Sequence, residues 1–277
     1  MGAEKVRWYF KLARPFTSLP ALPGGLILYL TVNDVNVENI AVGLLVGLSL
    51  VCVQAVGQII NQVVDIELDR YVKPHRPLPQ GKVAVSEALF LAFGLAVLGA
   101  FAAISVSYMA GGYYALAYVL MLFLAGYYSL PPFTPRYHSA WLNHMWVSAS
   151  RSLVPFLAVM GLDGLVYALI AFIWAVGWQG SKDVLDAEYD RRFGIKTLAN
   201  TYGVDFLKGL ALLSSATIAF LSILTFKPVF LLVAGYGLHG VGRYMDRWGG
   251  ENVYAWFVFY TGLALIGLLA FVDAKVL

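Results

Sequence analysis

The sequence predicts an all-α integral membrane protein, a bundle of about nine transmembrane helices. Of its 277 residues, 60% are hydrophobic and only 13% are charged, whereas a soluble domain carries about 25% charged residues. The apolar residues come in long uninterrupted runs, with a mean hydropathy of +0.73. A run of about 20 such residues spans the hydrocarbon core of a bilayer. Many Tyr and Trp residues lie near the expected helix ends, where interfacial aromatic belts occur.

The first segment, residues 1–15, reads as an amphipathic stretch at the membrane surface. Basic residues alternate there with aromatic and aliphatic ones, a pattern typical of interfacial helices. The segment lacks the short apolar core and the cleavage site of a signal peptide. The one cysteine, Cys52, lies in an apolar run and is expected to be a small buried side chain.

Nine apolar stretches follow as expected spans. They are 16–33, 38–64, 84–107, 109–130, 139–161, 164–182, 205–226, 228–242 and 252–272. The short links near 108 and 162 predict tight antiparallel hairpins. We expect one transmembrane domain over 1–277, with two four-helix halves plus one helix around a central cavity open to the cytoplasmic side.

The loop charges indicate how the chain is oriented. Sixteen of the 19 Lys and Arg residues fall on one side of the nine-span arrangement, and only Lys227 and Lys275 fall on the other. Arg151 lies within a span. Because cytoplasmic loops are enriched in Lys and Arg, we expect a multi-pass protein of the cytoplasmic membrane with its N-terminus inside and its C-terminus outside.

Two acidic clusters lie at the cytoplasmic ends of the second and sixth spans. Their members are Asn61, Asp65 and Asp69, then Asp183, Asp186 and Asp190. On a helix, spacings of i, i+4, i+8 and of i, i+3, i+7 place each set on one face. Crowded carboxylates repel one another unless a positive charge lies between them. Mg²⁺, which prefers oxygen ligands, is the expected cation.

Basic residues flank both acidic clusters, an arrangement suited to a metal–diphosphate complex. Neither a GxxxxGK[ST] loop nor a strand-linked GxGxxG is present, so phosphate would be held by metal and side chains. The simpler alternative for any single Lys or Arg is an ordinary charge in a cytoplasmic loop. That alternative is weaker for the acids, because Asp is rare near helix ends in lipid unless it is functional.

Three segments resemble the UbiA-type intramembrane prenyltransferases. NQVVDIELDRYVKPHRPLPQGKV is similar to the first aspartate signature of that family, and KDVLDAEYDRRFGIKTLANTYG is similar to the second. Between them, YYSLPPF resembles the Y-S-x-P-P segment of several branches. The resemblance runs along the chain in order and spacing. It implies a nine-helix bundle that catalyses Mg²⁺-dependent transfer of a polyprenyl group from its diphosphate to an acceptor.

The resemblance also implies roles for individual residues. The six cluster residues would bind Mg²⁺, and Asp65, Asp69, Asp183 and Asp190 would stabilise the departing diphosphate. The candidates for binding the diphosphate or the acceptor are Arg14, Arg76, Tyr128, Arg136, Asn143, Arg151 and Lys182. A structural ion pair is the alternative for Arg151, and an interfacial or interhelical role is the alternative for Tyr128 and Asn143. His144 is either an acceptor-side base or, as we favour, an interfacial hydrogen-bonding residue.

The acceptor is the least constrained feature. Asp69 and Arg76 are seven positions apart, and the 4-hydroxybenzoate enzymes of the family carry a longer insert there. The abundant bases suit an anionic acceptor, so the leading acceptor is geranylgeranylglyceryl phosphate, as in archaeal ether-lipid synthesis. An aromatic acceptor, 4-hydroxybenzoate or another quinone precursor, is the close alternative.

A cation-coupled transporter is the distant alternative, and it would need carboxylates near the bilayer midplane. The acids lie instead at helix ends on one side. The expected partners are therefore a polyprenyl diphosphate donor, a lipophilic or anionic acceptor and membrane lipids, with no nucleic acid.

Overall fold

The computed structural model describes residues 2–130, 134–244 and 253–277, and these residues contain helices and no strand. They form two compact units, Met1–Thr134 and Pro135–Leu277. The first unit contains the first four expected spans and the second unit contains the other five. The last expected span begins at residue 252, which lies outside the described residues.

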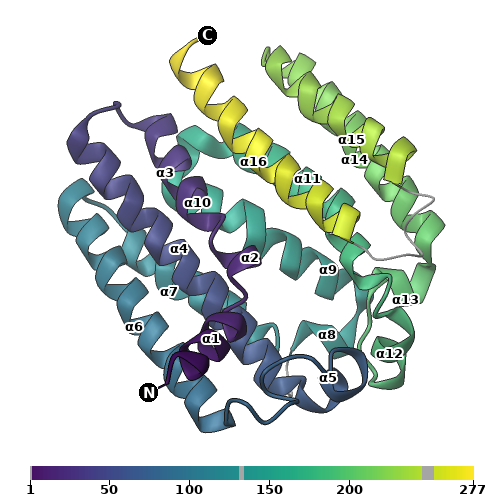
Figure 1. Ribbon diagram of the computed structural model, residues 1–277. Coiled ribbons are helices and arrows are strands. Elements are labelled where there is room, and N and C mark those ends of the chain that lie inside the picture. Colours follow the sequence, from purple (N-terminus) through teal and green to yellow (C-terminus); the bar gives the residue numbers. More distant parts are fainter. Residues whose placement is uncertain (1, 131–133, 245–252) are drawn as a thin grey trace. The chain divides into compact units, whose positions relative to one another are not determined.

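The first unit is built around its longest helix (Figure 1). Its helices are α1 (Ala3–Leu12), α2 (Pro15–Ser18), α3 (Ala21–Val32), α4 (Val37–Val64), α5 (Ile66–Val72), α6 (Val85–Ala110) and α7 (Tyr114–Tyr127). Helix α4 packs against α3, α6 and α7. Its 28 residues reach about 42 Å at 1.5 Å per residue, enough to cross a hydrocarbon core of about 30 Å.

Glycines bring α3 and α4 into backbone contact. A Cβ atom on Gly25 would lie 2.5 Å from Gly47 Cα, and a Cβ atom on Gly47 would lie 2.3 Å from the Leu22 carbonyl oxygen. Small residues permit this close approach, as is common where helices pack inside a membrane. The outer face of α6 instead exposes large apolar side chains, including Phe90, Phe93 and Phe101, as contact with lipid requires.

The second unit is arranged around α11. Its elements are α8 (Pro135–His138), α9 (Ala140–Ser148), η1 (Ala149–Leu153), α10 (Val154–Met160), η2 (Gly161–Gly164), α11 (Leu165–Trp178), η3 (Gln179–Asp183), α12 (Ala187–Arg192), α13 (Leu198–Tyr202), α14 (Val204–Leu224), η4 (Pro228–Phe230), α15 (Leu231–Tyr244) and α16 (Val253–Lys275). Helix α11 packs against α14 and α16 (Figure 1). Its Trp174 is fully buried, stacks on Trp178 and donates a hydrogen bond to the Phe259 carbonyl oxygen.

Six helical segments of the described chain are long and apolar enough to cross a membrane. One of them, Ala140–Asp183, contains two of the expected spans, which η2 separates. The expected spans at 109–130 and 228–242 correspond to α7 and α15, helices of 14 residues each. The prediction of an all-helical, multi-span protein is confirmed, whereas nine crossings stay a prediction.

Candidate active site

The first acidic cluster begins at the end of α4. The Asn61 side-chain amide donates to Asp65 Oδ2 at 2.8 Å, so the expected i, i+4 contact is present. Helix α4 ends at Val64, and α5 begins at Ile66, with Asp65 between them at φ −90° and ψ 17°. The i→i−4 backbone bonds of Asp65 and Asp69 continue across this junction. The cluster therefore spans the junction of α4 and α5, where Asp65 forms a turn.

Asp69 is buried and paired. Its Oδ2 atom lies 2.5 Å from a guanidinium nitrogen of Arg76, whose side chain is also largely buried. Burial raises the pKa of the Asp69 carboxyl, and the Arg76 charge opposes that rise. Two predicted site residues, one acid and one base, are thus brought together within the first unit.

Arg14 also points toward α4. Its guanidinium donates to Gln58 Oε1 at 2.7 Å, and Gln58 lies three residues before Asn61 on the same helix face. The Arg14 backbone has a φ of +49°, an uncommon value for a residue with a side chain. The following Pro15 disfavours the right-handed helical region at position 14, and the Thr17 and Ser18 hydroxyls bind the Arg14 carbonyl oxygen.

Ser129 belongs to this neighbourhood and was missed in the sequence. It is fully buried, and its Oγ atom lies 3.3 Å from the Asn61 amide nitrogen. The sequence feature that could have indicated Ser129 is its place in YYSLPPF, next to the predicted site residue Tyr128. Tyr128 itself is the C-cap residue of α7. Residues 131–133 of that segment lie outside the described residues.

The second acidic cluster does not lie on one helix, so the expected i, i+3, i+7 face is wrong. Asp183 ends the 3₁₀-helix η3, Asp186 precedes α12, and Asp190 lies within α12. Residues 184–186 form a turn between the two helices. The three acids nevertheless interact. Burial, and then the charges of Asp183 and Asp186, raise the pKa of the Asp190 carboxyl to about 7.

Two predicted bases accompany this second cluster. Lys182 lies 2.8 Å from Asp183 Oδ1. Arg136, on α8, is buried, and its charge lowers the pKa of Asp190 against the larger effect of burial. The Arg136 carbonyl oxygen accepts a hydrogen bond from the Lys196 N–H at 2.8 Å. This bond ties α8 to the segment that follows α12.

The remaining predicted residues of the second unit have structural contacts. The Asn143 amide donates to the Lys196 carbonyl oxygen at 2.6 Å, and Arg151 donates to the Tyr260 hydroxyl at 3.3 Å. Arg151 lies in the π-turn η1, where the Val154 N–H bonds to the Ala149 carbonyl. Pro155 has no N–H to offer the Arg151 carbonyl, and this missing donor accounts for the widened turn. Substrate binding by Asn143 and Arg151 stays a prediction.

His144 makes a hydrogen bond between helices, and its role as an acceptor-side base stays a prediction. Its Nε2 atom lies 2.8 Å from the Val176 carbonyl oxygen, an acceptor, so this nitrogen carries the proton. The side chain is buried and packs edge-on against Trp141.

The donor chemistry of the acidic clusters suits a hard cation. Within the described ranges, no group of three or more His, Cys, Asp or Glu side chains is close enough to hold a metal ion. Asp190, however, is buried, and the charges of Asp183 and Asp186 raise its pKa, so a cation would relieve the excess of negative charge at this cluster. Carboxylate oxygens are the ligands that Mg²⁺ prefers.

Comparisons with known proteins place the chain in a family. The profile of the UbiA prenyltransferase family matches residues 18–266. The chain belongs to the UbiA prenyltransferase family. It is therefore a prenyl-group transferase and a multi-pass integral membrane protein, and the transporter alternative is set aside.

Several relatives of this UbiA prenyltransferase are named digeranylgeranylglyceryl phosphate synthase. This chain is 31% identical to the digeranylgeranylglyceryl phosphate synthase of Ignicoccus hospitalis, over 85% of this chain and 76% of that protein. It is 29% identical to the protein of the same name from Methanoregula boonei, over 85% of this chain and 81% of that protein. A solved UbiA homologue from Archaeoglobus fulgidus, bound to GPP and Mg²⁺, has the same fold, with a TM-score of 0.73 and 20% identity over 97% of this chain and all of that one.

Proposed function

We propose that this UbiA prenyltransferase transfers a geranylgeranyl group from its diphosphate to the free hydroxyl of geranylgeranylglyceryl phosphate. The observation that carries the proposal is the similarity, at about 30% identity over 85% of the chain, to digeranylgeranylglyceryl phosphate synthases. The buried and partly buried cations near the acidic clusters, Arg14, Arg76, Arg136 and Lys182, support an anionic acceptor beside an anionic donor.

Mg²⁺ is the cofactor that we propose. Asn61, Asp65 and Asp69 are the proposed oxygen ligands in the first unit, and Asp183, Asp186 and Asp190 are those in the second. Bound there, Mg²⁺ would neutralise charge on the diphosphate leaving group. The relative from Archaeoglobus fulgidus was solved with Mg²⁺ and a prenyl diphosphate, which supports the same cofactor and donor class here.

The protein side chains have two tasks in this reaction. The Arg and Lys side chains would bind phosphate oxygens left free of metal. The bond between prenyl C1 and the diphosphate oxygen breaks with its electron pair on the diphosphate, leaving an allylic cation, and the acceptor hydroxyl oxygen then bonds to C1 and loses its proton to the released diphosphate. The apolar and aromatic helix faces would exclude water, which would otherwise capture the cation.

A competition experiment tests the acceptor. Purified protein receives labelled geranylgeranyl diphosphate, Mg²⁺, and equal amounts of geranylgeranylglyceryl phosphate and 4-hydroxybenzoate. We expect digeranylgeranylglyceryl phosphate as the labelled product, identified by mass spectrometry. A labelled prenylbenzoate in its place would show that the acceptor is aromatic.

The site faces the cytoplasm in our proposal. The support is the charge distribution of the sequence, in which 16 of the 19 Lys and Arg residues fall on the side of the two acidic clusters. This placement would let a charged diphosphate stay at the aqueous surface while its prenyl tail lies among the helices.

A further inference from the structure

Gln179 is a buried amide for which the described residues offer no hydrogen-bond partner. It is the first residue of η3, directly after α11, and its side chain is only 2% exposed. Neither its Oε1 nor its Nε2 atom has a partner among the residues that the structure describes. Buried polar groups are almost always hydrogen-bonded, because desolvating them otherwise costs stability. The amide therefore needs an explanation outside the fold itself.

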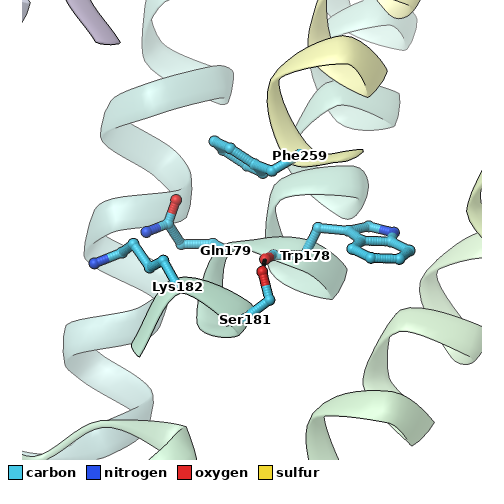
Figure 2. A pocket seen from close by; sticks show the side chains of 5 residues that line it. All are labelled: Trp178, Gln179, Ser181, Lys182 and Phe259. Atoms are coloured by element: carbon cyan, nitrogen blue, oxygen red, sulfur yellow. Dashed lines mark hydrogen bonds between the residues drawn. The ribbon is translucent and has the colours of Figure 1, made fainter. Parts of the chain in front are cut away.

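The amide lines a small hollow formed by Trp178, Gln179, Ser181, Lys182 and Phe259 (Figure 2). Gln179 and Lys182 extend to one side of η3, and Trp178 extends to the other. The Ser181 hydroxyl already donates to the Trp178 carbonyl oxygen at 2.6 Å. Gln179 thus offers a neutral polar group to a ligand, with Lys182 on the same side of η3 and Phe259 also lining the hollow.

The hollow admits a ligand group only if a side chain moves. It encloses about 130 Å³ of space, part of it open to the outside, and has no room for a water molecule as the side chains stand. Lys182 is the flexible part, because its side chain is 17% exposed and has a four-carbon stem. Movement of Lys182 away from Asp183, with which it is paired at 2.8 Å, would enlarge the hollow beside the amide.

The chemistry of the lining defines what would fit. An amide both accepts and donates hydrogen bonds, so its complement is a group that does both, such as a hydroxyl. The Lys182 ammonium favours an anionic oxygen close by. The Phe259 ring favours an apolar chain. An alcohol that carries both an anionic group and an apolar chain combines these three features.

We propose that Gln179 binds the acceptor, with Oε1 accepting a hydrogen bond from the reacting hydroxyl and Nε2 donating to the neighbouring anionic group beside Lys182. This inference rests on the proposed function and names the residue that orients its acceptor. An amide is too weak a base to take the proton at neutral pH. Its contribution is to hold the hydroxyl oxygen in place for attack.

The test separates binding from structure with two variants of the full chain. Gln179→Met keeps the length of the side chain and removes its polar atoms. Ser148→Ala is the matched control, since the Ser148 hydroxyl is also buried without a hydrogen-bond partner among the described residues but does not line the hollow. The measurements are the KM for acceptor, the KM for geranylgeranyl diphosphate and the Tm.

We expect Gln179→Met to raise the acceptor KM by about tenfold or more, as the loss of two hydrogen bonds predicts, and to leave the donor KM unchanged. Both variants should keep or raise the Tm, because each removes a buried unpaired polar group. An acceptor KM equal to that of Ser148→Ala would overturn the proposal. If Gln179→Met does not fold, Gln179→Asn replaces it, because this change moves the amide back by one methylene. Its acceptor KM is then compared with that of Ser148→Ala in the same way.

Failure of the proposed function gives a different result. If the wild-type protein prenylates only 4-hydroxybenzoate, the lipid acceptor is wrong, and the same comparison is made with that phenol. A raised KM for the phenol would still support Gln179 as the residue that binds the hydroxyl. An unchanged KM would refute the role of Gln179 independently of which acceptor is used.

Discussion

Asp69 and Arg76 form a buried ion pair within the first unit, with 2.5 Å between a carboxylate oxygen and a guanidinium nitrogen. The pair joins α5 to the loop that follows it. Breaking such a pair leaves one charge buried without its partner, which typically costs about 3–5 kcal/mol. The contact is thus part of the fold as well as of the candidate site.

Arg76→Met should destabilise the protein by about 3 kcal/mol or more, measured as unfolding in detergent. The double variant Asp69→Asn with Arg76→Met should be more stable than Arg76→Met alone, because no buried charge is stranded. Arg70→Met is the control, because Arg70 pairs with Glu67 and both side chains are exposed. Exposed ion pairs contribute less than about 1 kcal/mol to the free energy of unfolding. Equal losses for the two single variants would contradict the importance of burial.

Asp65→Ala and Asp183→Ala should each reduce Mg²⁺-dependent transfer by about a hundredfold or more, as the loss of transition-state charge stabilisation does elsewhere. EDTA should stop turnover by the wild-type protein, and added Mg²⁺ should restore it. Asp205→Asn is the control, because Asp205 is exposed and pairs only at the surface with Lys208. Full activity in a folded Asp65→Ala or Asp183→Ala protein would refute the proposed role of that acid.

Mg²⁺ binding should weaken as the pH falls below about 7. The pKa of the Asp190 carboxyl is raised to about 7 by burial and by the neighbouring acids. Below that pH the group carries a proton that a cation must displace, so affinity should fall by up to about tenfold per pH unit and level off above it. Calorimetric titrations at pH 6, 7 and 8 measure this trend. Affinities that do not change across the series would show that Asp190 is not a ligand.

Gly47→Ala should destabilise the first unit by about 1–3 kcal/mol, the usual cost of overpacking. The added methyl carbon would lie 2.3 Å from the Leu22 carbonyl oxygen, so α3 and α4 must separate. Gly94→Ala on α6 is the control, because a Cβ atom there meets nothing within 4 Å. Thermal unfolding in detergent compares the two, and equal stability would show that α3 and α4 do not pack this closely.

A cysteine placed at Glu67 should react with a membrane-impermeant maleimide only from the cytoplasmic side. Glu67 is exposed beside the first acidic cluster, and the native Cys52 is buried, so background labelling should be low. Labelling is compared in intact cells and in inverted vesicles. Reaction in intact cells without permeabilisation would reverse the proposed orientation.

Part of the candidate site could be predicted from the sequence because it depends on local spacing. Asn61 and Asp65 are four residues apart, and a helix brings such residues together whatever surrounds it. For the second cluster, the prediction that its three acids share one helix face was wrong, because α11 is followed by η3 at Gln179 and by a turn at 184–186. Ser129 was missed because its contact with Asn61 joins positions 68 residues apart.

The sequence by itself determined that the chain is a helical membrane protein with two acidic clusters and a prenyltransferase signature. Hydropathy and short-range spacing are properties of the sequence itself, and they can be assessed without knowing which segments pack together. The tertiary structure decided which acid is buried against which base, where helices bend, and which polar group faces a hollow without a hydrogen bond. The burial of these groups depends on segments far apart in sequence, which cover them only when the helices of each unit pack together.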